Sequence, residues 1–136
     1  MPAHLRLGSH VTVGIGVDVV DLERFASVMQ RQPRFVERVF TDNERAYCEQ
    51  AKGPSVQCQR FAARFAAKEA VMKALGCGLG AYGFHDVAVA RDDESGEPTL
   101  VVSGKAATLA GDRGVARWHL SLTHSDVVAV AFVVAD

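Results

Sequence analysis

Two glycines and an aspartate near the start of the chain form a short stretch with chemical potential. In Gly14-Ile-Gly-Val-Asp18 a carboxylate leaves a predicted strand beside a backbone with little side-chain bulk. The stretch is neither a dinucleotide fingerprint nor a P-loop, because Val19 stands where the third glycine belongs and no Gly-Lys-Ser/Thr follows. Spacing alone favours Asp18 or Asp21 as the N-cap of the next helix.

A second charged stretch is Arg64-Phe-Ala-Ala-Lys-Glu-Ala-Val-Met-Lys73. Glu69 and Lys73 share one side of the predicted helix and could form a routine ion pair worth about 0.2–0.5 kcal/mol. Their stripe lies between an aromatic face and an alanine face, so we expect both to be partly buried. Buried charges are costly unless they are paired or bound to a metal. Lys68 falls within the apolar arc, and its simplest interpretation is a lysine that extends its ammonium to solvent.

The third stretch, His119-Leu-Ser-Leu-Thr-His124, alternates polar and apolar residues. In a strand, His119, Ser121 and Thr123 share one face and the two leucines the other. This pattern is common in half-exposed strands. Hydrolysis by a serine–histidine pair has little support, because no GxSxG turn surrounds Ser121.

A basic segment follows the first strand. Residues 24–38 hold four arginines against one glutamate, Glu37, and Phe35 supplies an apolar side chain nearby. The segment is either a solvated face or a docking surface for an acidic partner. Nucleic acid is disfavoured, because the basic stretch is short and the whole chain has a formal net charge of -1.

The elements that must position these residues follow from periodicity and caps. Strands are expected over 11–19, 85–91, 98–102, 118–123 and 127–134. Helices are expected from Asp21, over 34–40, over 42–51 behind a Thr41/Glu44 capping box, over 57–75 with Gly76 as C-cap, and over 105–110. Residues 52–55 and the glycine-rich segment 76–83 are expected as loops. The sum is an α+β domain.

The helix over 57–75 is expected to be buried on most of its circumference. Bulky residues such as Phe61 and Phe65 lie on one face, and four alanines lie nearly opposite. The last strand is apolar at every position, so we expect burial on both faces, by the chain's own core or by a partner subunit.

Composition limits the class of protein. The chain has 136 residues, 49% hydrophobic and 23% charged, which suits one domain over 11–136 behind a loose leader at 1–10. Near-neutral charge excludes a nucleic-acid condenser or an acidic tail. Three cysteines without CxxC spacing indicate reduced thiols in a cytoplasmic protein. The longest apolar run, nine residues, is too short to span a membrane.

In their order and separation, the three stretches together resemble the holo-[acyl-carrier-protein] synthases, the small phosphopantetheinyl transferases. The resemblance runs from about Val11 to the end. It implies an antiparallel sheet packed with helices, one of them long and central. It also implies transfer of 4′-phosphopantetheine from coenzyme A to a serine of acyl carrier protein, with release of adenosine 3′,5′-bisphosphate, in support of fatty acid biosynthesis.

The resemblance also implies roles for residues. Asp18 and Glu69 would bind Mg²⁺, and Lys73 would neutralise the leaving phosphate; Glu69 or a metal-bound water would accept the serine proton. The residues expected at the coenzyme A site are Arg64, Gly76, Gly78, Gly96, Pro98, Thr123 and His124. Those expected to dock the acidic carrier protein are Arg24, Arg31, Arg34, Phe35 and Arg38. Relatives of this length are homotrimers with sites between subunits.

Two alternatives stay open from the sequence. One is a transferase devoted to carrier domains of polyketide or peptide synthases. The other is a non-catalytic module that binds coenzyme A or a carrier protein. Asp18, Glu69 and Lys73 argue against the second, because a silent binder needs no such set.

Overall fold

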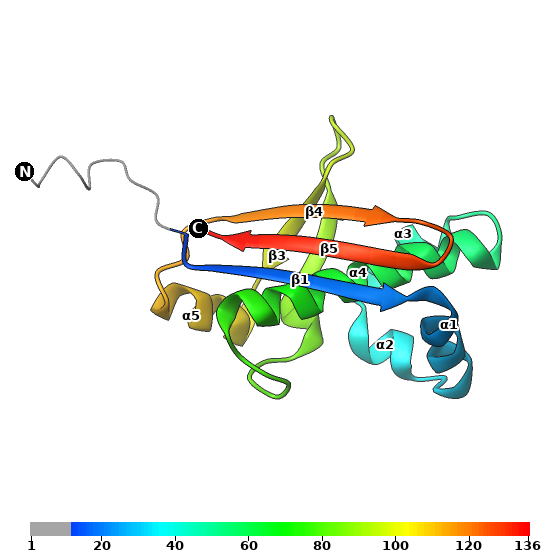
Figure 1. Ribbon diagram of the computed structural model, residues 1–136, viewed down its shortest axis with the longest axis horizontal. Coiled ribbons are helices and arrows are strands. Elements are labelled where there is room, and N and C mark those ends of the chain that lie inside the picture. The colour runs from blue at the N-terminus through cyan, green and yellow to red at the C-terminus, as the bar shows by residue number, and fades with distance from the viewer. Residues whose placement is uncertain (1–11) are drawn as a thin grey trace, which may run out of the picture.

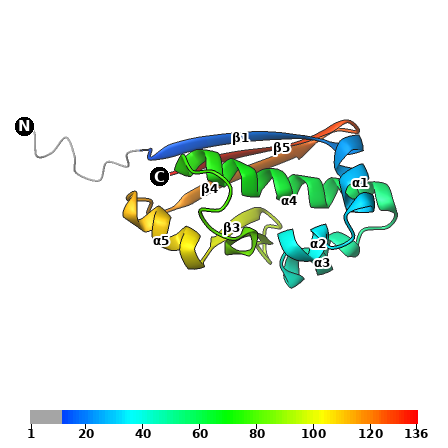
Figure 2. The same ribbon diagram turned by 90° about the horizontal axis from the view of Figure 1, so that it is seen from below.

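A three-stranded antiparallel sheet, in the order β1-β5-β4, covers one side of the long helix α4 (Figures 1 and 2). The computed structural model describes residues 12–136, so the expected leader lies outside the described residues. The elements are β1 Gly14–Asp21, α1 Leu22–Arg31, α2 Phe35–Val39, α3 Asp42–Glu49, α4 Pro54–Leu75, the 3₁₀ helix η2 Phe84–Asp86, β2 Val87–Arg91, β3 Pro98–Val102, α5 Gly104–Asp112, β4 Trp118–His124 and β5 Val128–Ala135.

Helix α4 is the middle layer of the molecule. The sheet lies on one side, and the β2–β3 hairpin with α2 and α3 lies on the other (Figure 2). Small residues meet at the sheet side, where Ala129, Ala131 and Ala135 are fully buried. Aromatic rings fill the opposite side, with Phe40 and Phe61 at a centroid separation of 4.9 Å. The α+β fold with a long central helix is confirmed.

Several local predictions are also confirmed. The Asp21 carboxylate accepts a hydrogen bond from the Arg24 backbone N–H at 3.0 Å and caps α1. Thr41 and Glu44 form the capping box of α3. Gly76 ends α4 in the left-handed conformation, with φ of 65°.

Several element boundaries differ from the prediction by one to three residues; the first strand, expected over 11–19, is β1 over Gly14–Asp21. Helix α4 begins at Pro54 rather than Gln57, because a proline in the first turn loses no helical hydrogen bond. Residues 54 and 55 are therefore helical and not loop. His85 lies in η2, and the strand begins at Val87. Among residues 12–136, no helix is both long and apolar enough to cross a membrane.

The outer face of the sheet is apolar and open in this chain. Phe132 on β5 is paired with Val17 on β1, and Ile15 and Val19 flank Val17 on the same face. Phe132 is 43% exposed and Val19 59%. The chain's own core therefore buries only one face of β5, and burial of the other face by a partner subunit stays a prediction.

Candidate active site

A pocket of about 310 Å³ lies where β1 runs into α1 beside the middle of α4. Asp18 and Glu69 line it together with Arg24 and the rings of Phe25 and Phe65. Asp18 points to the helix side of β1, because strand residues alternate and the neighbouring Val17 and Val19 face outward. The two expected metal ligands thus share one partly apolar pocket.

The two carboxylates are close enough to affect each other. Glu69 is half-buried, and burial followed by the negative charge of Asp18 raises its pKa, against the opposing effect of Lys73. Three carboxylates, those of Asp18, Asp21 and Glu69, line the pocket against the cations Arg24 and Lys73, which leaves negative charge in it. A divalent cation would relieve this repulsion.

Lys73 is placed differently from the prediction. Its ammonium donates to Asp18 Oδ1 at 3.1 Å and to the Val17 carbonyl at 2.9 Å. It therefore pairs across to β1 rather than with Glu69 on its own helix, because α4 lies against the β1 backbone at this height. The expectation of partial burial holds for Glu69 but is wrong for Lys73, whose side chain is 57% exposed.

The donor set suits Mg²⁺. Over residues 12–136, no three His, Cys, Asp or Glu side chains gather closely enough to form a complete metal cage. Mg²⁺ does not require one, since it usually takes one or two protein carboxylates, retains waters and adds substrate phosphates. Asp18 and Glu69 fit that pattern.

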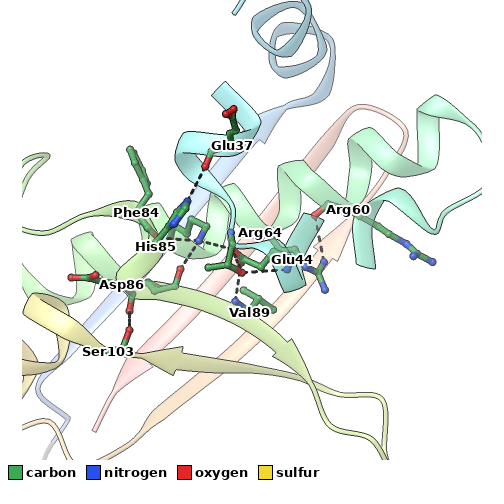
Figure 3. Close-up of polar contacts among 12 residues, drawn as sticks. Glu37, Glu44, Arg60, Arg64, Phe84, His85, Asp86, Val89 and Ser103 are labelled. Atoms are coloured by element: carbon green, nitrogen blue, oxygen red, sulfur yellow. Dashed lines mark hydrogen bonds and ion pairs between the residues drawn. The ribbon is translucent and has the colours of Figure 1, made fainter. Parts of the chain in front are cut away.

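Lys68 does not reach solvent, so its predicted orientation is wrong. The side chain is fully buried, and its ammonium donates to Glu44 Oε1 at 2.8 Å and to the carbonyls of Phe84 and Val87. Figure 3 shows two of these partners, Glu44 and Phe84. Burial lowers the pKa of Lys68, and Glu44 opposes that effect. The sequence gives no sign of this partner, which lies 24 residues earlier on another helix.

A second polar cluster surrounds Tyr47 on α3. The guanidinium groups of Arg60 and Arg64 each lie 4.3 Å from its ring centroid, and that of Arg91 lies 5.0 Å away. The expected coenzyme A residues Arg64 and His124 both line the adjoining pocket of about 320 Å³. Sequence reasoning missed Tyr47, Arg60 and Arg91; the only signal was Arg60 one helical turn before Arg64, a like-charged pair that needs a reason.

The other residues expected at the coenzyme A site lie in separate parts of the chain's surface. The Gly96 carbonyl accepts a hydrogen bond from Arg91 Nε at 3.1 Å, and Pro98 pairs with Arg91 across the hairpin. Thr123 is exposed on the face of β4 opposite to His124. Gly76 and Gly78 follow the end of α4 nearest Lys73. Within one chain, Arg64 lies about 140° around the α4 axis from Glu69, so the two face different pockets.

The expected docking residues form an exposed basic surface, with one exception. Arg24, Arg31, Arg34 and Arg38 are exposed, and Arg24 also lines the Asp18–Glu69 pocket. Phe35 is half-buried among other rings, with its centroid 5.7 Å from those of Phe25 and Phe65. Phe35 therefore contributes to the core as well as to the surface.

Comparison with known proteins decides the family. The model of the 4′-phosphopantetheinyl transferase superfamily matches residues 14–133. The chain is also 47% identical to the holo-[acyl-carrier-protein] synthase of Frankia casuarinae over 124 residues, which cover 91% of this chain and 97% of that protein. The chain belongs to this superfamily.

Solved transferases of the superfamily share the fold. A holo-(acyl-carrier-protein) synthase from Bacillus anthracis in complex with CoA (3′,5′-ADP) is 38% identical, with a TM-score of 0.75 over 93% of this chain and 97% of that one. A Plasmodium yoelii acyl carrier protein synthase with ADP bound is 28% identical, with a TM-score of 0.82 over 94% and 97%.

Proposed function

We propose that this chain is a holo-[acyl-carrier-protein] synthase. It moves the 4′-phosphopantetheine group of coenzyme A to a serine of apo acyl carrier protein, releases adenosine 3′,5′-bisphosphate and so supports fatty acid biosynthesis. The observation that carries the proposal is the Asp18–Glu69 pocket bordered by Arg24, in a chain with relatives of this name at 46–47% identity.

The carboxylates of Asp18 and Glu69 would hold Mg²⁺, which when bound supplies positive charge to the diphosphate of coenzyme A. Lys73 remains exposed while it touches Asp18, so its ammonium can turn toward a leaving phosphate. Phe25 and Phe65 make one wall of the pocket apolar, which limits water around the reacting groups. The chain's own residues therefore supply binding, charge and partial exclusion of water.

A shared site explains why the expected residues fall into two groups in one chain. Arg64 and His124 face one pocket and Glu69 another, and neither group is complete alone. The open apolar face around Val17 and Phe132 supports association. We therefore place the active site between subunits of a homotrimer, with the arginines around Tyr47 facing the phosphates of coenzyme A.

The arginines of α1 and α2 would dock the acidic acyl carrier protein, which brings its serine to the pocket that Arg24 borders. Four exposed arginines would make this association salt-sensitive. The three cysteines are free thiols, which supports a cytoplasmic location.

The deciding experiment incubates the protein with apo acyl carrier protein, coenzyme A and Mg²⁺, and measures one added phosphopantetheine by mass spectrometry. Asp18→Asn and Glu69→Gln are expected to abolish transfer while leaving the circular dichroism spectrum unchanged. A panel of polyketide and peptide synthase carrier domains tests the rival substrate class. Coenzyme A binding without transfer to any carrier would refute the enzymatic proposal.

The shared site is tested by mixing two inactive variants. Glu69→Gln and Arg64→Ala damage different pockets, so mixed oligomers contain some interfaces with both pockets intact. Activity should return after the variants are unfolded and refolded together, and it should not return when they are only mixed as preformed oligomers that do not exchange. No recovery after co-refolding would contradict a site built from two chains.

A further inference from the structure

Two glycines of β1 lie directly against the backbone of α4. A Cβ atom built on Gly16 would lie 1.8 Å from the Ala70 carbonyl oxygen, 2.7 Å from its carbonyl carbon and 2.9 Å from the Ala74 nitrogen. A Cβ on Gly14 would lie 1.8 Å from the Ala74 carbonyl oxygen. These obstacles are backbone atoms, so no side-chain rotation relieves them, and any larger residue requires strand and helix to separate.

The two glycines lie at different distances from the carboxylates. Gly16 precedes Asp18 by two residues, and Ala70, which it touches, directly follows Glu69. Gly14 begins β1, about 13 Å along the strand from Asp18. The closest approach of β1 to α4 near the metal pocket is therefore the contact at Gly16.

Helix α4 is held on its other side. The Lys68 ammonium, one residue before Glu69, is held by Glu44 and by the carbonyls of Phe84 and Val87. Phe61 packs there against Phe40. Strand β1 is held by its pairing with β5 and by the Lys73 contacts to Val17 and Asp18, but its outer residues, such as Val19, are exposed, so β1 can move outward together with β5. A wedge between the two elements would therefore displace β1, and Asp18 with it, rather than α4.

We propose that Gly16 is a positioning residue for the metal site: its missing side chain sets the separation between β1 and α4, and so between the carboxylates of Asp18 and Glu69. The proposal rests on the proposed function, because it assigns both carboxylates to one ion. It gives the first glycine-containing motif a role in spacing two metal ligands, without any contact between glycine and substrate.

The test compares Gly16→Ala with Gly14→Ala, which introduces the same 1.8 Å clash at the start of the strand. Mn²⁺ binding to the protein saturated with coenzyme A is measured by electron paramagnetic resonance, and stability by thermal unfolding without metal. Both variants should lose stability. Gly16→Ala should weaken Mn²⁺ binding by about tenfold or more, as loss of support for a ligand does, whereas Gly14→Ala should bind Mn²⁺ almost as the parent protein does.

Ala131→Cys provides a milder wedge in case Gly16→Ala does not fold. Ala131 on β5 is fully buried and pairs with Asp18 on β1. An added sulfur atom at Ala131 would therefore enlarge the gap between the sheet and α4 beside Asp18. Weaker Mn²⁺ binding by the folded variant supports the proposal. Parent-like Mn²⁺ affinity in folded Gly16→Ala or Ala131→Cys, or equal losses at Gly14 and Gly16, would overturn it. If the parent protein itself transfers no phosphopantetheine and binds no Mn²⁺, the proposed function fails as well.

Discussion

Loss of the buried Lys68–Glu44 pair should destabilise the protein more than any surface change. Both side chains are almost fully buried, at 1% and 0% exposure, and the ammonium lies 2.8 Å from the carboxylate. Lys68→Met fills the same space without the charge. Glu44 then keeps hydrogen bonds from the Thr41 and Val89 backbone N–H groups but loses its cation.

The size of the expected loss in the free energy of unfolding follows from the charge that stays buried without its partner. Removing one partner of a buried ion pair costs about 3–5 kcal/mol, because the other charge is left uncompensated. Lys68→Met also leaves the Phe84 and Val87 carbonyls without this donor. Glu44→Gln preserves shape but leaves the ammonium without its counter-charge, so we expect a loss of similar size. The double variant leaves no unpaired charge, so its loss should be smaller than the sum by about 2–3 kcal/mol.

The assay is urea unfolding followed by circular dichroism at one fixed protein concentration, because association contributes to the stability of an oligomer. Lys105→Met, on the exposed surface of α5, is the control and should change the free energy of unfolding by less than about 0.5 kcal/mol. Strictly additive losses in the double variant, or single losses no larger than that of Lys105→Met, would refute the reasoning.

The remaining predictions concern other parts of the molecule. Burial raises the pKa of Cys48 from 9.0 to about 12, so between these values the unfolded chain releases a proton that the folded chain keeps. The free energy of unfolding should therefore fall as pH rises above 9, and Cys48→Ala should flatten that slope in urea titrations; an unchanged slope would exclude this thiol as its source. Thr41→Val removes the capping-box oxygen of α3 and should lower the free energy of unfolding in urea titrations by about 1 kcal/mol; an unchanged stability would show that the cap contributes nothing. Phe132→Lys places a charge on the apolar outer face of the sheet and should lower the oligomer mass seen by light scattering; an unchanged mass would remove this face from the interface. Arg91→Ala should weaken coenzyme A binding in calorimetry, and a parent-like affinity would separate the Tyr47 cluster from the ligand.

Local signals in the sequence were reliable where the structure depends on neighbours along the chain. The Asp21 cap, the Thr41–Glu44 capping box and the Gly76 terminus each involve residues at most four positions apart. Helical periodicity likewise located α4, although the predicted helix began at Gln57, three residues after its actual start at Pro54. These features could be predicted because their partners lie within one helical turn.

Partners far apart in sequence could not be predicted from periodicity. Lys73 pairs with Asp18 rather than with Glu69, because Gly14 and Gly16 bring the β1 backbone within its reach. Lys68 pairs with Glu44 on α3, so a residue expected to extend to solvent instead forms a buried ion pair that joins α4 to α3. The helix wheel placed Lys68 correctly in the apolar arc but overestimated the burial of Lys73, and in both cases tertiary packing determined the partner.

The division of charged residues on α4 has a consequence for assembly. Glu69 and Arg64 leave the same helix about 140° apart and line different pockets, which is why we propose that two chains contribute to one site. A dimer with twofold symmetry could join the two patches only if both lay on the same interface, which two sides of α4 about 140° apart do not. A closed ring brings the Glu69 side of each chain against the Arg64 side of the next, and every interface is then identical. A head-to-tail ring would thus join Glu69 of one chain with Arg64 of the next at every interface, which gives one site for each chain. The refolding experiment with Glu69→Gln and Arg64→Ala tests that arrangement directly.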